Sequence, residues 1–170
     1  GRWLDGHMTE RAGTPARPDD LVDVVQELRD EDEQPFEDNA DRMVFFCKGV
    51  LETVKKFGWA PDIVHCHGWM TSLIPLYLKT TYKNEPLFEN AKVVYSSYES
   101  DNFAQYFNDS FAAKASINNL QEADLHSYQN GEGVTLEAGA IRSADAIVRG
   151  SENLLDEAQS TLAESEKPVT

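Results

Sequence analysis

Short apolar runs that alternate with helix-like segments constrain the fold of this chain most. The runs at 63–67, 92–96 and 145–149 contain β-branched residues, which is typical of buried strands. Segments with helical periodicity lie between them, at 70–82 and at 133–143. Strands that alternate with helices form parallel β-α units with right-handed crossovers. The sequence therefore predicts an α/β protein whose parallel sheet is flanked by helices.

An amphipathic segment precedes the first of these strands. Five apolar residues recur there at spacings of three and four, namely Met43, Cys47, Val50, Val54 and Phe57. Most of the charged residues lie off this stripe, so a helix over about 40–57 is predicted to bury it.

The remaining segments carry weaker patterns. Short helices are expected near 110–118 and 120–127, and the turn signal NGEGV lies at 130–134. Residues 152–166 are predicted to form a helix, and residues 167–170 to begin a further strand.

Composition limits the possible functions. The chain has 170 residues, enough for one ordinary domain, and a formal net charge of −15. That charge argues against nucleic acid and against an anionic membrane surface as partners. The sequence has no run of about 18 apolar residues and does not open like a signal peptide, so we expect a cytoplasmic protein. Cys47 and Cys66 lie in apolar runs and are predicted to be buried reduced thiols rather than a disulfide.

Ligands of parallel sheets bind beyond the carboxyl ends of the strands, which selects the tips at 65–69, 96–99 and 149–152. On a strand, His65 and His67 share one face and Cys66 takes the other, so the three cannot bind one metal ion. We therefore expect no metal site. His65 is expected to be a buried structural residue, whereas His67 lies nearer the tip, where its ring can reach a ligand.

Gly68 and Trp69 lie at the predicted change from strand to helix. A glycine allows close backbone approach or a positive φ, and the amino end of a helix favours an anion such as phosphate or carboxylate. Alternatively, Gly68 only makes the turn and Trp69 only packs. The phosphate-binding motifs G-x-G-x-x-G and G-x-x-x-x-G-K-[ST] do not occur in the sequence.

The segment PDIVHCHGWMTSLIPLYLK, residues 61–79, resembles the H-x-H-D-W-H-T region of the starch and glycogen synthases, glycosyltransferase family 5. Supporting similarity lies upstream in PFEDN and RMVFFCKGVLETVKKFGW, and downstream in LFENAKVVYSSY and SADAIVRGSENLLDEAQ. The resemblance covers about residues 30–170. It is nearest to short bacterial glycogen synthase-like proteins that carry only the amino-terminal domain.

The resemblance implies a GT-B glycosyltransferase, in which two Rossmann-like domains face each other across a cleft. Such an enzyme transfers glucose from ADP-glucose to an α-1,4-glucan and needs no metal and no cofactor. The expected ligands are thus a nucleotide sugar and an α-glucan. Among the expected substrate-binding residues, His67, Trp69 and Thr71 match the family by this resemblance. Gly68 and Ser97 are expected to join them because they lie at the selected strand tips.

Several positions depart from the family pattern. The Lys-x-Gly-Gly loop does not occur, Gly68 stands where the family has Asp, and Met70 stands where it has His. Residues 95–98, Tyr-Ser-Ser-Tyr, replace a Thr-x-His-Asn strand tip. No catalytic residue is therefore assigned.

These departures leave alternatives open. We expect residues 29–170 to be a partial amino-terminal domain of the family, and residues 1–28 to be an irregular segment outside it, with a short helix possible at 19–29. A partner domain or a partner chain would complete the cleft. The alternatives are a non-catalytic α/β domain that binds glucan, nucleotide or a partner chain, and a truncated chain with an incomplete sheet.

Overall fold

The computed structural model describes residues 36–170, apart from 101–103, 105–106, 108–110, 119 and 131–132. The chain divides into two compact units, Gly1–Asn39 and Ala40–Thr170, and the fold below is that of the second. The expectations for residues 1–28, including the helix at 19–29, lie outside the described residues.

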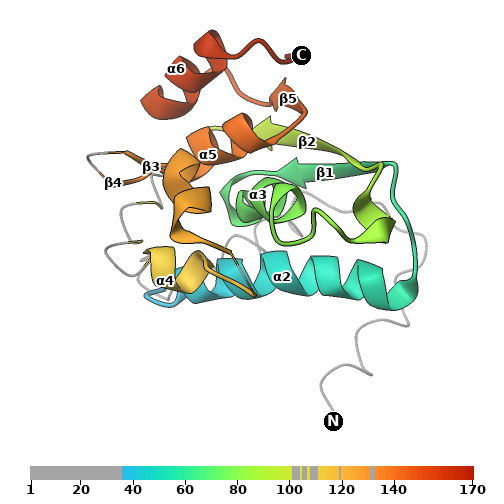
Figure 1. The fold of residues 1–170 in the computed structure, drawn as a ribbon. Coiled ribbons are helices and arrows are strands. Elements are labelled where there is room, and N and C mark those ends of the chain that lie inside the picture. The colour runs from blue at the N-terminus through green and yellow to red at the C-terminus, as the bar shows by residue number, and fades with distance from the viewer. Residues whose placement is uncertain (1–35, 101–103, 105–106, 108–110, 119, 131–132) are drawn as a thin grey trace, which may run out of the picture. The chain divides into compact units, whose positions relative to one another are not determined.

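A parallel sheet with the strand order β1-β2-β5 organises this unit (Figure 1). Its strands are β1 (Ile63–His67), β2 (Lys92–Ser97) and β5 (Ala146–Arg149). The α-helices are α2 (Asn39–Phe57), α3 (Leu73–Lys79), α4 (Phe111–Ala115), α5 (Leu136–Ser143) and α6 (Asp156–Glu164). Short 3₁₀ helices span Trp69–Thr71, Pro86–Phe88 and Glu122–Tyr128. The predicted α/β class with a parallel sheet is confirmed.

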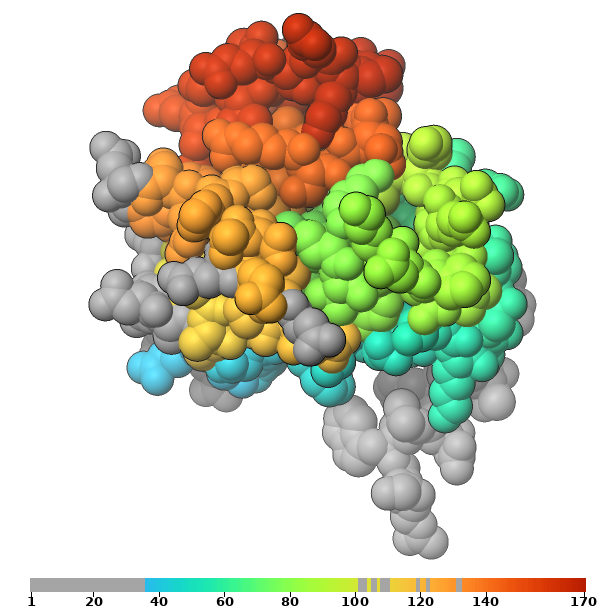
Figure 2. Space-filling view, viewed as in Figure 1, coloured from blue at the N-terminus to red at the C-terminus, as the bar shows by residue number. Residues whose placement is uncertain are grey.

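Two elements in the second half of the chain are shorter than predicted: the helix expected at 133–143 and the strand expected at 167–170. The helix expected at 133–143 begins only at Leu136, because Gly133–Val134 form strand β4, which pairs with β3 (Gln129–Asn130) in a small hairpin. The turn signal at 130–134 marks this hairpin. The strand expected at 167–170 is present as a parallel bridge between Val169 and Ile147. Figure 2 shows α6 lying against α5.

One face of the parallel sheet is buried. The register aligns Cys66 of β1 with Tyr95 of β2 and Ile147 of β5, and all three side chains are buried. Ser97 of β2, on the same face, is hydrogen-bonded to Glu137 of α5. We therefore place α5 over this face.

Within the described part of the chain, the opposite face of the sheet is exposed along β1, while Ser96 of β2 on the same face is buried. It includes Ile63, His65 and His67, the alternate residues of β1, and 61% of the surface of Ile63 is accessible. Val94 of β2, which the register places beside His65, is half-buried.

Helix α2 confirms the prediction for 40–57 but not the whole predicted stripe. Met43 and Cys47 are buried as expected, and Leu51 continues the row at the next spacing of four. Phe57 is 80% exposed, so its predicted burial was wrong. The reason is that Phe57 is the last residue of the helix and Gly58, with a φ of 67°, turns the chain away from it.

The helix expected at 70–82 begins later than predicted. A 3₁₀ turn, Trp69–Thr71, comes first, and α3 starts at Leu73. Pro75 is the third residue of α3, where its missing N–H removes no hydrogen bond of the helix. The proline therefore limits how early the regular helix can start.

Both cysteines are buried free thiols, as predicted. The Cys47 thiol donates to the Met70 carbonyl oxygen at 3.2 Å, which links α2 to the turn after β1. Burial raises the pKa of Cys47 and that of Cys66 to about 12, so both thiols stay protonated at neutral pH.

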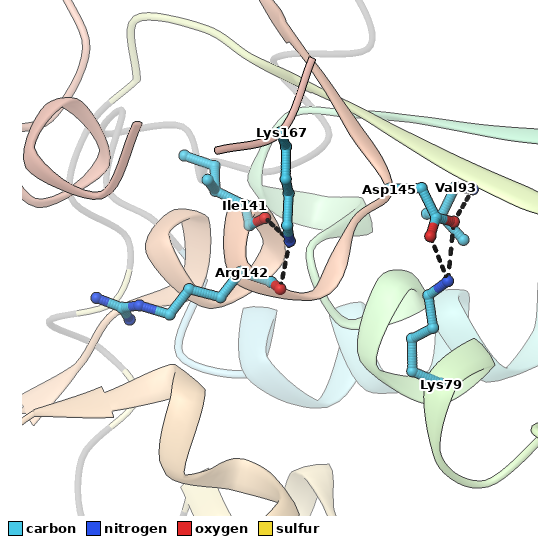
Figure 3. A network of polar contacts seen from close by, with 6 residues as sticks. All are labelled: Lys79, Val93, Ile141, Arg142, Asp145 and Lys167. Atoms are coloured by element: carbon cyan, nitrogen blue, oxygen red, sulfur yellow. Dashed lines mark hydrogen bonds and ion pairs between the residues drawn. The ribbon is translucent and has the colours of Figure 1, made fainter. Parts of the chain in front are cut away.

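Asp145 ties the start of β5 to its neighbours (Figure 3). Its carboxylate accepts bonds from Lys79 Nζ at 2.7 and 2.8 Å and from the Val93 N–H at 2.8 Å. Partial burial acts to raise the pKa of Asp145, but the bonds from Lys79 and Val93 outweigh it and lower this pKa below 3.8. Nearby, Lys167 Nζ donates to the carbonyl oxygens of Ile141 and Arg142 at the end of α5.

Replacing Asp145 with alanine is expected to lower the free energy of unfolding by about 1–2 kcal/mol, because the Val93 N–H loses its acceptor. Lys79→Met removes only a partly exposed ion pair, so its loss should stay under about 1 kcal/mol. A carboxylate with a lowered pKa stabilises the fold above its unfolded pKa and ceases to do so as the pH falls. The deficit of Asp145→Ala should therefore shrink below pH 3.8. Urea unfolding of both variants across this range measures it, and equal deficits would contradict the role given to Val93.

Among the described residues, none of the helices is both long enough and apolar enough to cross a bilayer.

Candidate functional site

The tips of β1, β2 and β5 meet at one end of the sheet. β1 ends at His67, β2 at Ser97 and β5 at Arg149, and the register pairs His67 with Ser96 and Ser97 with Arg149. The three tips selected from the sequence are therefore adjacent, as the rule for parallel sheets requires.

Gly68 makes the turn after β1. Its φ of 66° lies in the left-handed region, which side-chain-bearing residues rarely adopt. The Gly68 N–H donates to the Ser96 carbonyl oxygen at 2.9 Å, so the turn is joined to β2. Its own carbonyl oxygen accepts bonds from the Thr71 N–H at 3.1 Å and the Thr71 hydroxyl at 2.9 Å. Thr71 thus holds the turn in place.

The predicted anion site at a helix amino end is not supported by this geometry. Since α3 begins at Leu73, the regular helix does not start at Gly68 or Trp69, and only the 3₁₀ turn offers N–H groups there. Trp69 is buried, which agrees with the alternative that it packs.

His65 and His67 lie side by side on the exposed sheet face, with ring centroids 4.0 Å apart. His65 Nε2 lies 2.8 Å from the Ser96 hydroxyl, and His67 Nδ1 lies 3.0 Å from the Tyr98 hydroxyl. The expected burial of His65 was wrong, because its face of the sheet is open among the described residues. Partial desolvation, and then the neighbouring His67, lower the pKa of His65.

Tyr98 lies between two of the strand tips. Its ring is stacked near that of His67, with an interplanar angle of 22° and centroids 6.1 Å apart. Its other neighbour is Gly150, where any Cβ would overlap with the Tyr98 ring. The Gly150 N–H donates to the Ser97 carbonyl oxygen at 2.8 Å. The absence of a side chain at 150 therefore makes room for Tyr98.

Arg149, at the end of β5, is engaged with its own loop. Its guanidinium donates to the carbonyl oxygens of Ser151 and Glu152. It therefore orders the loop after β5 rather than facing the other tips as a free cation.

A buried carboxyl group lies behind β2. Glu137, the second residue of α5, is 1% exposed. Its two oxygens accept hydrogen bonds from the hydroxyls of Ser97 and Ser100, the latter at 3.1 Å. Burial raises the pKa of Glu137, while the bonds from both serines act in the opposite direction.

The structure brings some of the predicted site residues together and separates others. His67, Gly68 and Thr71 share one turn, with Trp69 buried beside it. Ser97 lies on the other face of the sheet from His67, where its hydroxyl is bonded to Glu137. In the described part of the chain, no three His, Cys, Asp or Glu side chains are placed to hold a metal ion.

Tyr98, Gly150 and Glu137 were not among the predicted site residues. Tyr98 lies in the selected strand tip at 96–99 and Gly150 in the one at 149–152, so their positions in the sequence already indicated them. Glu137 carried a subtler signal, since it lies three and four residues before the buried Ala140 and Ile141. A carboxylate on the buried stripe of a helix indicates a polar partner inside the protein.

The fold is similar to that of part of a known catalytic domain. The catalytic domain of starch synthase IV from Arabidopsis thaliana, a structure bound to ADP and acarbose, matches with a TM-score of 0.52 and 19% identity. The match covers 66% of this chain and 23% of that one. The fold is thus that of part of a GT-B glycosyltransferase catalytic domain.

Sequence comparison identifies the family. A family model described as the starch synthase catalytic domain matches residues 19–166, and the chain therefore belongs to that family. The match begins before residue 29, where we expect the domain to start, so it takes in part of the segment 1–28. The boundary between residues 28 and 29 stays a prediction.

The relatives are glycogen synthases. That of Clostridium perfringens is 34% identical over 125 residues, which make up 71% of this chain and 25% of the relative. That of Chlorobaculum tepidum is 35% identical over 116 residues, which make up 67% of this chain and 22% of the relative. That of Chlorobium luteolum is 52% identical over 56 residues, or 12% of its length. This chain therefore spans a quarter or less of each of these relatives.

Proposed function

We propose that this chain forms one wall of a glucosyltransferase site, at which glucose passes from ADP-glucose to an α-1,4-glucan in the cytoplasm. The observation that carries the proposal is the family match over most of the chain, together with the His67–Gly68 turn at the carboxyl end of β1. The names of the relatives and the ADP and acarbose bound to the plant enzyme support this substrate class.

The proposed ligand-binding residues have distinct roles. His67 contacts the ligand with its exposed ring, and Gly68 allows close approach of the backbone. Thr71 fixes the turn because its hydroxyl donates to the Gly68 carbonyl oxygen, and the buried Trp69 packs beneath the turn in the protein interior. Ser97, whose side chain lies on the other face of β2, holds the end of that strand in place through its hydrogen bond to Glu137.

Residues 29–170 would then be a partial amino-terminal domain, with a partner domain or a partner chain facing the strand tips. A departing ADP carries negative charge that a catalytic site stabilises with fixed cations and N–H donors. Arg149 is engaged with its own loop, so the proposal assigns that charge stabilisation to the facing wall.

Calorimetric titration of the full chain with ADP, ADP-glucose and maltoheptaose tests whether this wall binds its substrates. We expect binding of ADP-glucose and of maltoheptaose. Transfer of radiolabelled glucose from ADP-glucose to glycogen tests activity in parallel. A chain that binds neither the nucleotide sugar nor the oligosaccharide would overturn the proposal.

The engagement of Arg149 also favours a second candidate, a non-catalytic domain that binds glucan. Binding of maltoheptaose without any binding of ADP or ADP-glucose, and without transfer, would support this second function over the first.

His67→Ala is expected to weaken binding of the ligand by about tenfold, because it removes an exposed ring from the turn that faces the ligand. His65→Ala is the matched control, since its ring lies 4.0 Å from that of His67 but is bonded to Ser96. It should leave binding unchanged and lower the free energy of unfolding by about 1 kcal/mol, as the buried Ser96 hydroxyl loses its partner. Equal losses of binding in both variants would contradict the assignment of His67.

A further inference from the structure

The segment from Ser97 to Ser100, directly after β2, is held from behind by a single side chain. Glu137 accepts a hydrogen bond from Ser97 on one carboxyl oxygen and from Ser100 on the other. The two serines flank Tyr98, so this carboxyl group bridges both ends of the short segment that carries the tyrosine.

Stability alone does not explain a carboxyl group at this place. Burying such a group is unfavourable unless hydrogen bonds or an opposite charge compensate for it. Both oxygens of Glu137 are hydrogen-bonded to neutral hydroxyls, and within the described residues the carboxyl forms no ion pair. Among the described residues no cation offsets this burial: burial raises the pKa of Glu137, and only its bonds from Ser97 and Ser100 act in the opposite direction.

The segment that Glu137 holds, residues 97–100, places Tyr98 at the candidate site. The Tyr98 ring rests on Gly150 of the β5 tip, and its hydroxyl lies 3.0 Å from Nδ1 of His67 at the β1 tip. A shift of the segment would move this hydroxyl out of reach, because a hydrogen bond weakens steeply with distance and angle.

We propose that Glu137 is a positioning residue: by holding Ser97 and Ser100 it sets Tyr98 against Gly150 and thereby fixes the orientation of the His67 ring. The identity of the ligand rests on the proposed function, but the positioning itself does not.

The experiment therefore uses one readout that needs no ligand. The ring signals of His67 are followed by ¹H–¹³C correlation NMR in the wild type, in Tyr98→Phe and in Glu137→Ala. Tyr98→Phe removes the contact directly and defines the signal of a His67 ring without it. Glu137→Ala is expected to move the His67 signal toward that of Tyr98→Phe, and Glu137→Gln is expected to restore it, because an amide can still bridge two hydroxyls.

Two further variants separate positioning from stability. Ser100→Ala breaks one of the two bonds at a partly exposed residue and should move the His67 signal part of the way, even if Glu137→Ala does not fold. Glu157→Gln changes a different carboxylate, the half-buried Glu157 of α6, and should leave the signal in place. A His67 signal that stays at its wild-type position in Ser100→Ala and in folded Glu137→Ala, or that Tyr98→Phe fails to move, would overturn the proposal.

Maltoheptaose and ADP-glucose titrations of the same variants then connect the positioning to the ligand. Binding is expected to weaken by about tenfold in Glu137→Ala and to recover in Glu137→Gln. If the wild type binds neither ligand, the proposed function fails while the NMR result still decides the role of Glu137. If the variants move the His67 signal but bind as the wild type does, Glu137 does not position a ligand-binding ring.

Discussion

Gly139→Ala is expected to lower the free energy of unfolding by about 3 kcal/mol, although alanine favours a helix more than glycine does. Gly139 lies in α5, and a Cβ there would overlap with the ring of Tyr128. That ring cannot move aside, because Tyr128 is fully buried and its hydroxyl donates to the Ser72 carbonyl oxygen at 2.6 Å. Overpacking at this contact should outweigh the gain in helix propensity.

Gly49→Ala is the matched control for this substitution. Gly49 also lies within a helix, α2, but a Cβ there would meet no atom within 4 Å. The control should raise the free energy of unfolding by about 0.5–1 kcal/mol through helix propensity alone. Urea unfolding followed by circular dichroism measures both variants. Stabilisation by both would show that Tyr128 leaves room at position 139.

Gly150→Ala is expected to disturb the candidate site more than the fold. A Cβ at 150 would overlap with the Tyr98 ring, but Tyr98 is only half-buried and can swing toward solvent. The loss of stability should therefore be about 1 kcal/mol. Displacement of Tyr98 should move the His67 ring signal to its position in Tyr98→Phe and weaken maltoheptaose binding by about tenfold.

The cause of this effect is specific to the contact with Tyr98. The φ of Gly150 lies outside the left-handed region, so alanine can adopt the same backbone conformation. Calorimetry and NMR measure the two readouts, with Gly49→Ala as a glycine substitution that touches neither ring. An unchanged His67 signal in Gly150→Ala would contradict the placement of Tyr98 against the β5 tip.

The regular elements could be predicted because their patterns are local. The period of α2 and the β-branched residues of β1, β2 and β5 depend on neighbours along the chain, so these elements lie where the sequence predicts them. The helix predicted to start at residue 70 starts at Leu73, three residues later. Pro75 already indicated this, because a proline is tolerated only in the first turn of a helix.

Burial could be predicted less well, because it depends on what covers each face. The alternation of His65 and His67 with Cys66 correctly separated two faces of β1, but only the structure shows which face is open among the described residues. His65 and Phe57 were assigned to the interior for this reason, and both are exposed.

The candidate site could be predicted only where it follows from strand ends. His67 and Gly68 lie at such an end, and the rule for parallel sheets selects them. The contacts of Tyr98 with Gly150, and of Glu137 with Ser97, join residues that lie about 40 or more positions apart. They depend on the register of β2 and β5 and on the rotation of α5, which no local pattern specifies.

The central strand β2 accepts a hydrogen bond from each of the two glycine turns, from Gly68 on one side and from Gly150 on the other. These amides should exchange with deuterium from solvent more slowly than loop amides without a backbone partner, since each bond must break before its amide exchanges. Because these bonds join both turns to β2, we expect a ligand to meet the rim of the candidate site already formed rather than to close it around itself.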